Sequence, residues 1–264
     1  MINQELINFA NHLADLSSNI AQKYFRKKIN EQKKHDNSPV TIADQEIETI
    51  LRKEIVKKYP DHGIIAEEFD DVNLNSDFKW VIDPIDGTSS FIIGKPVFAT
   101  LICLTYKNRP ILGVINQPIT NERWLGVDNK DTVFNGKKTF VRKSHHLSNS
   151  VLCTTSPSFF KGRDMEIFNK INSKTLYQKH GGVFYGGDAY LYGLMALGSV
   201  DVILEASLSN FDYCALVPII TGAGGIITDW QGRDVDVNSD GRILACGDKK
   251  VHSEILDIIN NFNL

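Results

Sequence analysis

Apolar residues recur at helical spacing near the start of the chain. Positions 3–28 are apolar every three or four residues, which predicts a long amphipathic helix. A polar stretch over 29–40 ends in Ser38-Pro39, which predicts a break. Thr41-Ile-Ala-Asp44 has the form of a capping box, and the helix that it opens is expected to stop before Pro60.

Shorter apolar runs separated by turn residues predict strands in the middle of the chain. The Asn-Gly pair at 135–136 is a strong hairpin signal. The expected strands cover 64–66, 79–82, 97–106, 111–117 and 122–127. Beyond residue 150 strands and helices alternate, with strands at 151–155, 200–204, 226–228 and 243–247 and helices at 163–172, from 188 to near 198, at 211–220 with an interruption at Pro218, and at 249–261. This order predicts a layered α/β or α+β architecture.

Composition bounds the class of protein. The chain has 264 residues, of which 42% are hydrophobic, enough for a sizeable core. We expect one catalytic unit over 1–264, with possible halves 1–145 and 146–264 that meet where composition shifts. The net charge of −3 predicts no broad attraction to nucleic acid or anionic lipid.

Cysteine usage and the N-terminus indicate the compartment. The four cysteines are far apart and form no CxxC pair, which is typical of reduced core thiols in a cytosolic protein. The first residues lack a basic segment followed by an apolar run, so we expect no signal peptide. No apolar stretch approaches the roughly 20 residues that span a bilayer. These observations predict a cytoplasmic protein without a membrane partner.

The run from Trp80 to Phe91 carries the most informative chemistry. Asp83 and Asp86 follow an apolar strand, and Gly87-Thr88 come next. Carboxylate oxygens are ligands that Mg²⁺ prefers. Free backbone N–H groups at the start of a helix suit a phosphate. Because buried like charges repel, the pair needs a cation or protons, and one loop could hold both a metal and a phosphate.

Three further acids end predicted elements, Asp44, Glu67 and Asp212. A single acid of this kind is most often a solvated surface carboxylate. The seven histidines are scattered, and a site of hard oxygen ligands without histidine argues against zinc.

Other motif-based classes fail on spacing. Haloacid-dehalogenase phosphatases need D-x-D, whereas this chain has D-x-x-D. The loop lacks the alternating oxygen ligands of an EF-hand. Gly222-Ala-Gly-Gly225 is a poor dinucleotide-binding match, because its glycine spacing is wrong and its strand follows it.

Four segments together resemble the inositol monophosphatase family. They are Ser38-Pro-Val-Thr-Ile-Ala-Asp44, Ala66-Glu-Glu68, Trp80-Val-Ile-Asp-Pro-Ile-Asp-Gly-Thr88, and Phe211-Asp-Tyr-Cys-Ala215 followed by Gly222-Ala-Gly-Gly225. The resemblance spans nearly the whole chain. It implies an α+β fold, a layered αβαβα sandwich, that forms a homodimer. It also implies Mg²⁺-dependent hydrolysis of a small phosphate monoester, inhibited by Li⁺.

The resemblance assigns metal ligands. Glu67, Asp83 and the backbone carbonyl of Ile85 would hold a first Mg²⁺. Asp83, Asp86 and Asp212 would hold a second, so Asp83 would bridge both ions. Such sites coordinate phosphoryl oxygens and lower the pKa of a bound water.

It also assigns the groups around the reacting water. Thr88 and Asp44 would orient and activate it, next to Glu67. The N–H groups of Gly87 and Thr88 would hold a phosphate oxygen. Glu68 would lie behind the ligands or assist a weaker metal.

Three residues are candidates for the substrate pocket. Glu205 lies seven residues before Asp212, where family members hold a substrate hydroxyl or amine; the alternative is a strand-end acid that faces water. Asp188 either lines the same pocket or caps a helix. Lys33 is a candidate to approach the phosphate.

Within the family, Gln117-Pro-Ile-Thr-Asn-Glu-Arg-Trp124 and Tyr185-Gly-Gly-Asp188 resemble the bacterial histidinol-phosphate phosphatase branch. Ser89, Ala189 and Thr221 depart from it, and Ser89 replaces a frequent cation. Histidinol phosphate and inositol monophosphate are therefore the leading substrates, the first slightly ahead. The alternatives are a bisphosphate, either fructose 1,6-bisphosphate or a nucleotide 3′-phosphate, and a regulatory role in binding a macromolecular partner.

Overall fold

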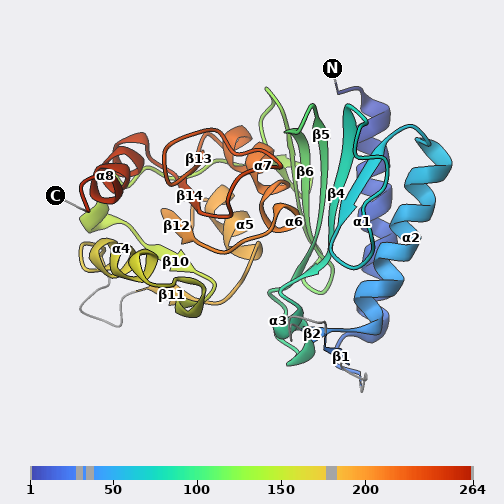
Figure 1. Cartoon of the computed structure of the whole chain (residues 1–264), viewed down its shortest axis with the longest axis horizontal. Helices are drawn as coiled ribbons and strands as arrows, with labels where there is room; N and C mark the ends of the chain where they lie inside the picture. Colours follow the sequence, from blue (N-terminus) through green and yellow to red (C-terminus); the bar gives the residue numbers. More distant parts are fainter. Residues whose placement is uncertain (1, 28–31, 34–38, 177–182, 263–264) are drawn as a thin grey trace.

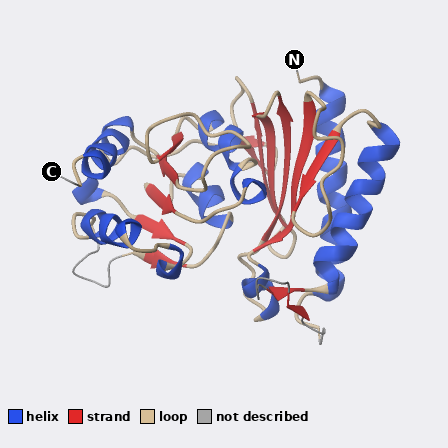
Figure 2. Cartoon of the chain, viewed as in Figure 1, coloured by secondary structure: helices blue, strands red, loops and turns tan. Residues whose placement is uncertain are grey.

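The computed structural model describes residues 2–27, 32–33, 39–176 and 183–262. Five layers follow one another across the molecule, helix pair, sheet, helices, sheet and helix pair (Figures 1 and 2). Helices α1 (Gln4–Tyr24) and α2 (Ile42–Lys58) cover the outer face of the larger sheet. Helices α4 (Arg163–Asn172) and α8 (Lys249–Asn260) cover the outer face of the smaller one. The expected α+β sandwich is confirmed.

Seven strands form the larger sheet, in chain order across its width. They are β3 (Gly63–Ala66), β4 (Phe78–Asp86), β5 (Ala99–Tyr106), β6 (Arg109–Gln117), β7 (Glu122–Val127), β8 (Val133–Phe134) and β9 (Lys137–Lys138). Strand β3 runs parallel to β4, and all other neighbours are antiparallel. The hairpin predicted at 135–136 joins β8 and β9, with both turn residues at positive φ.

Five strands form the smaller sheet, in the order β11-β10-β12-β14-β13. They are β10 (Leu152–Thr154), β11 (Phe184–Tyr185), β12 (Val202–Glu205), β13 (Ile226–Asp229) and β14 (Ile243–Cys246). A two-stranded piece, β1 (Gln32–Lys33) and β2 (Pro39–Val40), lies near the short helix α3 (Thr88–Ile92). The remaining short turns of 3-10 helix cover Leu147–Asn149 and Pro157–Phe159.

Three short helices fill the layer between the sheets, α5 (Tyr190–Ala196), α6 (Asn210–Tyr213) and α7 (Leu216–Gly222). Apolar side chains from these helices and from both sheets form one continuous buried cluster. Two further clusters lie under the outer helix pairs. Burial of apolar surface in these three clusters is the main contribution to the stability of the layered fold.

Helix α7 lies unusually close to the larger sheet because two glycines face it. A Cβ added to Gly113 would lie 2.0 Å from the carbonyl oxygen of Ala215, and one added to Gly126 would lie 2.4 Å from the backbone nitrogen of Ile219. No side chain fits in either place. The close contact places α6, just before α7, beside β4.

Two predicted helices differ in the structure. The helix expected over 3–28 ends at Tyr24, because Phe25 is extended (ψ 129°) and Arg26 has a φ of 56°. Residue 28 lies outside the described residues. The helix expected at 211–220 is two helices, and it breaks at Cys214–Ala215 rather than at Pro218. Pro218 is the third residue of α7, where a backbone N–H has no partner within the helix, so proline is tolerated.

The cysteines and the helices bear on two further expectations. All four cysteines are buried and free, as expected. Among the described residues, no helix is long and apolar enough to cross a membrane.

Candidate active site

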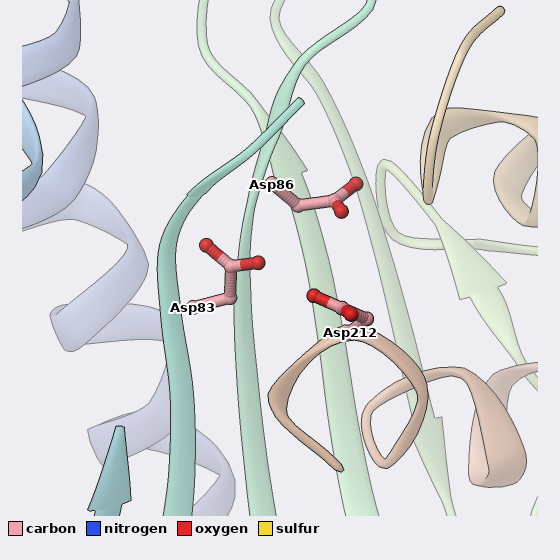
Figure 3. A group of neighbouring side chains, drawn as sticks. All are labelled: Asp83, Asp86 and Asp212. Atoms are coloured by element: carbon pink, nitrogen blue, oxygen red, sulfur yellow. The ribbon is translucent and has the colours of Figure 1, made fainter. Parts of the chain in front are cut away.

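Three carboxylates meet where β4 faces α6. Asp83 and Asp86 belong to β4 and Asp212 to α6, and each offers an oxygen within 4.8 Å of the others (Figure 3). In a regular strand, side chains three residues apart point to opposite faces. Here the pairing of β4 with β5 shifts between Asp83 and Asp86, a β-bulge that brings both side chains to the same region. Thr100 Oγ1 holds the bulge by donating to the carbonyl of Pro84 at 2.8 Å.

Backbone N–H groups orient two of these acids. Asp86 Oδ2 accepts from the Ala189 N–H at 2.6 Å, and Asp212 Oδ2 accepts from the Ser209 N–H at 2.7 Å. Asp83 is 2% exposed, and its Oδ1 is buried with no hydrogen-bond partner among the described residues. Leaving a buried polar atom without a partner costs free energy. A positive group bound at Asp83 would remove that cost.

The acids share an electrostatic environment that disfavours their charge. Burial, followed by the charge of Glu67, raises the pKa of Asp83 well above its usual range. Burial, followed by the charge of Asp188, does the same to the pKa of Asp86. Burial raises the pKa of Asp212 to about 7. A cation bound among them would reverse this penalty.

Two more of the predicted acids lie close by. Glu67 follows β3 and lines the same cavity as Asp83. Asp44 is buried in the first turn of α2, where Oδ2 accepts from the Thr41 N–H at 2.8 Å and from Thr41 Oγ1 at 2.6 Å. This is the predicted capping box. Asp44 Oδ1 is buried without a partner among the described residues, and burial raises the Asp44 pKa to about 6.

The turn after β4 combines a glycine and a threonine. Gly87 has a φ of 82°, which favours glycine, and a Cβ there would lie 2.6 Å from Asp188 Oδ2. Thr88 begins α3, and its Oγ1 donates to the carbonyl of Ile85 at 3.1 Å. The expected strand end at residue 82 is wrong, because β4 continues to Asp86.

These groups line one cavity between the two sheets. Its walls carry residues from both halves of the chain, most of them polar. They include Glu67, Asp83, Ile85, Asp86, Gly87, Thr88, Thr155, Asp188, Tyr192, Glu205 and Asp212. The metal-ligand candidates and the substrate-pocket candidates therefore share one space. Of the predicted site residues, Asp44 is not among the lining residues. The Lys33 side chain lies outside the described residues.

Glu205 is a buried acid at the end of β12. It is 1% exposed, and its carboxylate accepts from the Thr155 N–H at 2.7 Å and from the hydroxyls of Thr155 and Thr154 at 2.9 and 3.0 Å. Burial raises the Glu205 pKa to about 7, although these hydrogen bonds oppose the shift. The alternative of a strand-end acid that faces water is wrong.

Asp188 lines the cavity and lies just before helix α5. Its φ is 45°, and the residue that caps α5 is Ala189, so the helix-cap alternative for Asp188 is wrong. The Ser90 hydroxyl donates to Asp188 Oδ2 at 3.4 Å. Burial raises the Asp188 pKa.

The sequence reasoning missed Thr154, Thr155 and Tyr192. Thr154 and Thr155 hold Glu205 from 50 residues away. Tyr192 is 1% exposed on α5, and burial, then the charge of Glu205, raises its pKa well above the usual range. The sequence holds no signal that singles out Tyr192, because the same apolar helix also carries Tyr190.

The fold and this acid cluster define the class. The structure matches that of an inositol monophosphatase from Zymomonas mobilis with a TM-score of 0.87, 40% sequence identity, and coverage of 97% of this chain and 98% of the other. The protein is a phosphoric monoester hydrolase of a metal-dependent class.

Sequence comparison gives the family. The profile of the inositol monophosphatase family matches residues 2–263. The chain is 43% identical to the chloroplastic bifunctional phosphatase IMPL2 of Arabidopsis thaliana, over 96% of this chain and 75% of that protein. It is 31% identical to a histidinol-phosphatase of Chlorobaculum parvum, over 90% of this chain and 91% of that protein. The chain belongs to the inositol monophosphatase family.

Proposed function

We propose that the protein hydrolyses a small phosphate monoester with Mg²⁺, through two metal ions. The observation that carries this proposal is the cluster of Asp83, Asp86 and Asp212, in which a buried oxygen of Asp83 has no partner among the described residues. Its donors are all hard oxygens, and their mutual repulsion needs a positive charge, so the residues fit Mg²⁺.

The proposed ligands follow from the resemblance and agree with the cavity. Glu67, Asp83 and the carbonyl of Ile85 would hold one ion, and Asp83, Asp86 and Asp212 the other. When bound, such ions stabilise charge on the phosphoryl oxygens and lower the pKa of a water.

The chain's own groups would position the reactants. The N–H groups of Gly87 and Thr88 would bind a phosphate oxygen at the start of α3. The Thr88 hydroxyl and the Asp44 carboxylate would orient the attacking water, and Asp44 Oδ1 is a buried acceptor available to hold its proton. Glu67 would stand beside both, since its charge acts on Asp44 and Asp83. Glu68, whose N–H donates to Glu48 Oε2 at 2.7 Å, would support these ligands.

The acids of the cavity that are not proposed as metal ligands favour a substrate with hydroxyl or amine groups. They are Glu205, which is buried, and Asp188, which is partly buried. Such acids would accept hydrogen bonds from an alcohol and pair with an ammonium group. Histidinol phosphate therefore stays slightly ahead of inositol monophosphate, with support from the histidinol-phosphatase relative.

Phosphate release tests this function. The rates on histidinol phosphate, inositol 1-phosphate and fructose 1,6-bisphosphate would be compared by kcat/KM, with Mg²⁺ and with EDTA. A dominant rate on one monoester, lost with EDTA, is the expected result. A dominant rate on the bisphosphate would instead support the bisphosphatase alternative. Weak and similar rates on all three would mean either a broad phosphatase or the regulatory role. Capture of a macromolecular partner that also binds the Asp83→Asn variant would support the regulatory role.

Two further implications of the resemblance are proposals, a homodimer and inhibition by Li⁺. Composition and cysteine usage give two more, a single catalytic unit over 1–264 with halves 1–145 and 146–264, and a cytoplasmic location. Solution molecular mass and Li⁺ titration of the Mg²⁺-dependent rate would test the first two.

Replacement of Glu205 by Gln is expected to change substrate preference. The variant keeps the shape but loses the charge, so an ammonium-bearing substrate should lose about ten- to a hundredfold in kcat/KM relative to inositol 1-phosphate. The Mg²⁺ dependence should stay the same. Glu122→Gln is the control, because Glu122 accepts from Thr120 and Tyr190 outside the cavity. An unaltered ratio between the two substrates would remove Glu205 from substrate recognition.

A further inference from the structure

Tyr192 lines the active-site cavity. The side chain is 1% exposed, and its hydroxyl has no hydrogen-bond partner among the residues that the structure describes. Buried tyrosine hydroxyls usually find a partner, because leaving one without costs free energy. Phenylalanine has nearly the same shape and would avoid that cost. We therefore expect the hydroxyl to bind a partner that enters the cavity.

The position of Tyr192 limits what that partner can be. The charges of Glu205, Asp86 and Asp212 all act on its phenol. Asp86 and Asp212 belong to the proposed metal and phosphate end, and Glu205 to the end proposed for the alcohol. Tyr192 lines the same cavity as the acids of both ends. A phosphate monoester has one atom that joins its two ends, the ester oxygen between phosphorus and carbon.

We propose that the Tyr192 hydroxyl donates a hydrogen bond to the ester oxygen of the substrate. This inference rests on the proposed function. A phenol is a protonated donor at neutral pH. The hydrogen bond strengthens as the reaction proceeds, because charge builds on the oxygen that it contacts.

The electron balance is that of simple hydrolysis. The oxygen of the attacking water forms a bond to phosphorus, and the bond from phosphorus to the ester oxygen breaks. Its electron pair stays on the ester oxygen, which leaves with a proton from water as an alcohol. Tyr192 keeps its own proton throughout and stabilises the departing oxygen.

Two aryl phosphates test this placement in Tyr192→Phe. Phenyl phosphate and p-nitrophenyl phosphate have similar rings, but the nitro group spreads the charge of the departing oxygen, which then needs a donor less. We expect kcat/KM of the variant to fall about ten- to a hundredfold on phenyl phosphate and less than about threefold on p-nitrophenyl phosphate. The melting temperature of the metal-free variant should be equal to or above that of the wild type, because an unpaired buried hydroxyl is removed.

Tyr190→Phe is the matched control. Tyr190 is on the same helix, but its hydroxyl donates to Glu122 Oε2 at 2.7 Å, outside the cavity. Its removal should lower the melting temperature and leave the ratio of the two aryl phosphates unchanged. Equal losses on both substrates in Tyr192→Phe, no loss on either, or a lower melting temperature would each overturn the inference. Absence of Mg²⁺-dependent hydrolysis by the wild type on every monoester would instead overturn the proposed function.

Discussion

Replacement of Asp83 by Asn is expected to lower kcat by about a thousandfold or more, roughly 4 kcal/mol of transition-state stabilisation. Asp83 is the acid proposed to contact both metal ions, and its Oδ1 has no other partner among the described residues. Asn is nearly the same size and removes one charge without opening a cavity. The measurement is phosphate release at saturating substrate over a range of Mg²⁺ concentrations.

The stability of the same variant separates a lost ligand from a damaged fold. Without metal, Asp83→Asn should melt at a higher temperature than the wild type, because a buried like charge is gone. With Mg²⁺ the order should reverse, since bound metal stabilises the wild type more.

A buried acid outside the cavity provides the control. Asp201 is 1% exposed, and Arg142 holds it through two contacts of 2.6 Å. Asp201→Asn should lower the melting temperature and leave kcat near the wild-type value. A near-wild-type kcat in Asp83→Asn would contradict the two-metal proposal.

Replacement of Gly126 by Ala is expected to destabilise the protein by about 3 kcal/mol or more. The added Cβ would lie 2.4 Å from backbone atoms of Pro218 and Ile219, so α7 must move away from β7. Because α6 immediately precedes α7, Asp212 should move with it, and Mg²⁺ should stabilise the variant less than the wild type. Chemical denaturation with and without Mg²⁺ measures both effects.

Gly136→Asn is the comparison. Gly136 lies in the β8–β9 turn with no atom within 4 Å of an added Cβ, and Asn tolerates its φ of 78°. Its stability should change by less than about 0.5 kcal/mol. If Gly126→Ala were equally mild, α7 would lie further from the sheet than the structure has it.

The parts of the fold that could be predicted are those determined by residues close together in the sequence. The capping box at Thr41 and the Asn-Gly turn at 135–136 each depend on residues that are neighbours in sequence, and both are present. The acids at the ends of elements were found for the same reason. The break in the helix at 211–220 was misplaced, because Pro218 is harmless in a first turn and the real break depends on packing against the sheet.

The rest of the site depends on residues that are far apart in sequence. The bulge that turns Asp83 and Asp86 to one side arises from pairing with β5, which sequence periodicity does not reveal. Glu205 is buried because Thr154 and Thr155 reach it from a neighbouring strand. Sequence alone therefore pointed to acids that the fold brings close together, but not to how each is held.

Asp44 and Asp212 each use one carboxylate oxygen to cap the helix that carries them. Asn can accept the same backbone hydrogen bond, whereas Ala cannot, so only the change to Asn removes the charge and keeps the first turn. In evolution, a copy of this gene could thus lose its chemistry in a single step and still fold. Descendants retained only for their shape would then be recognisable by Asn at position 44 or 212 in an otherwise intact helix.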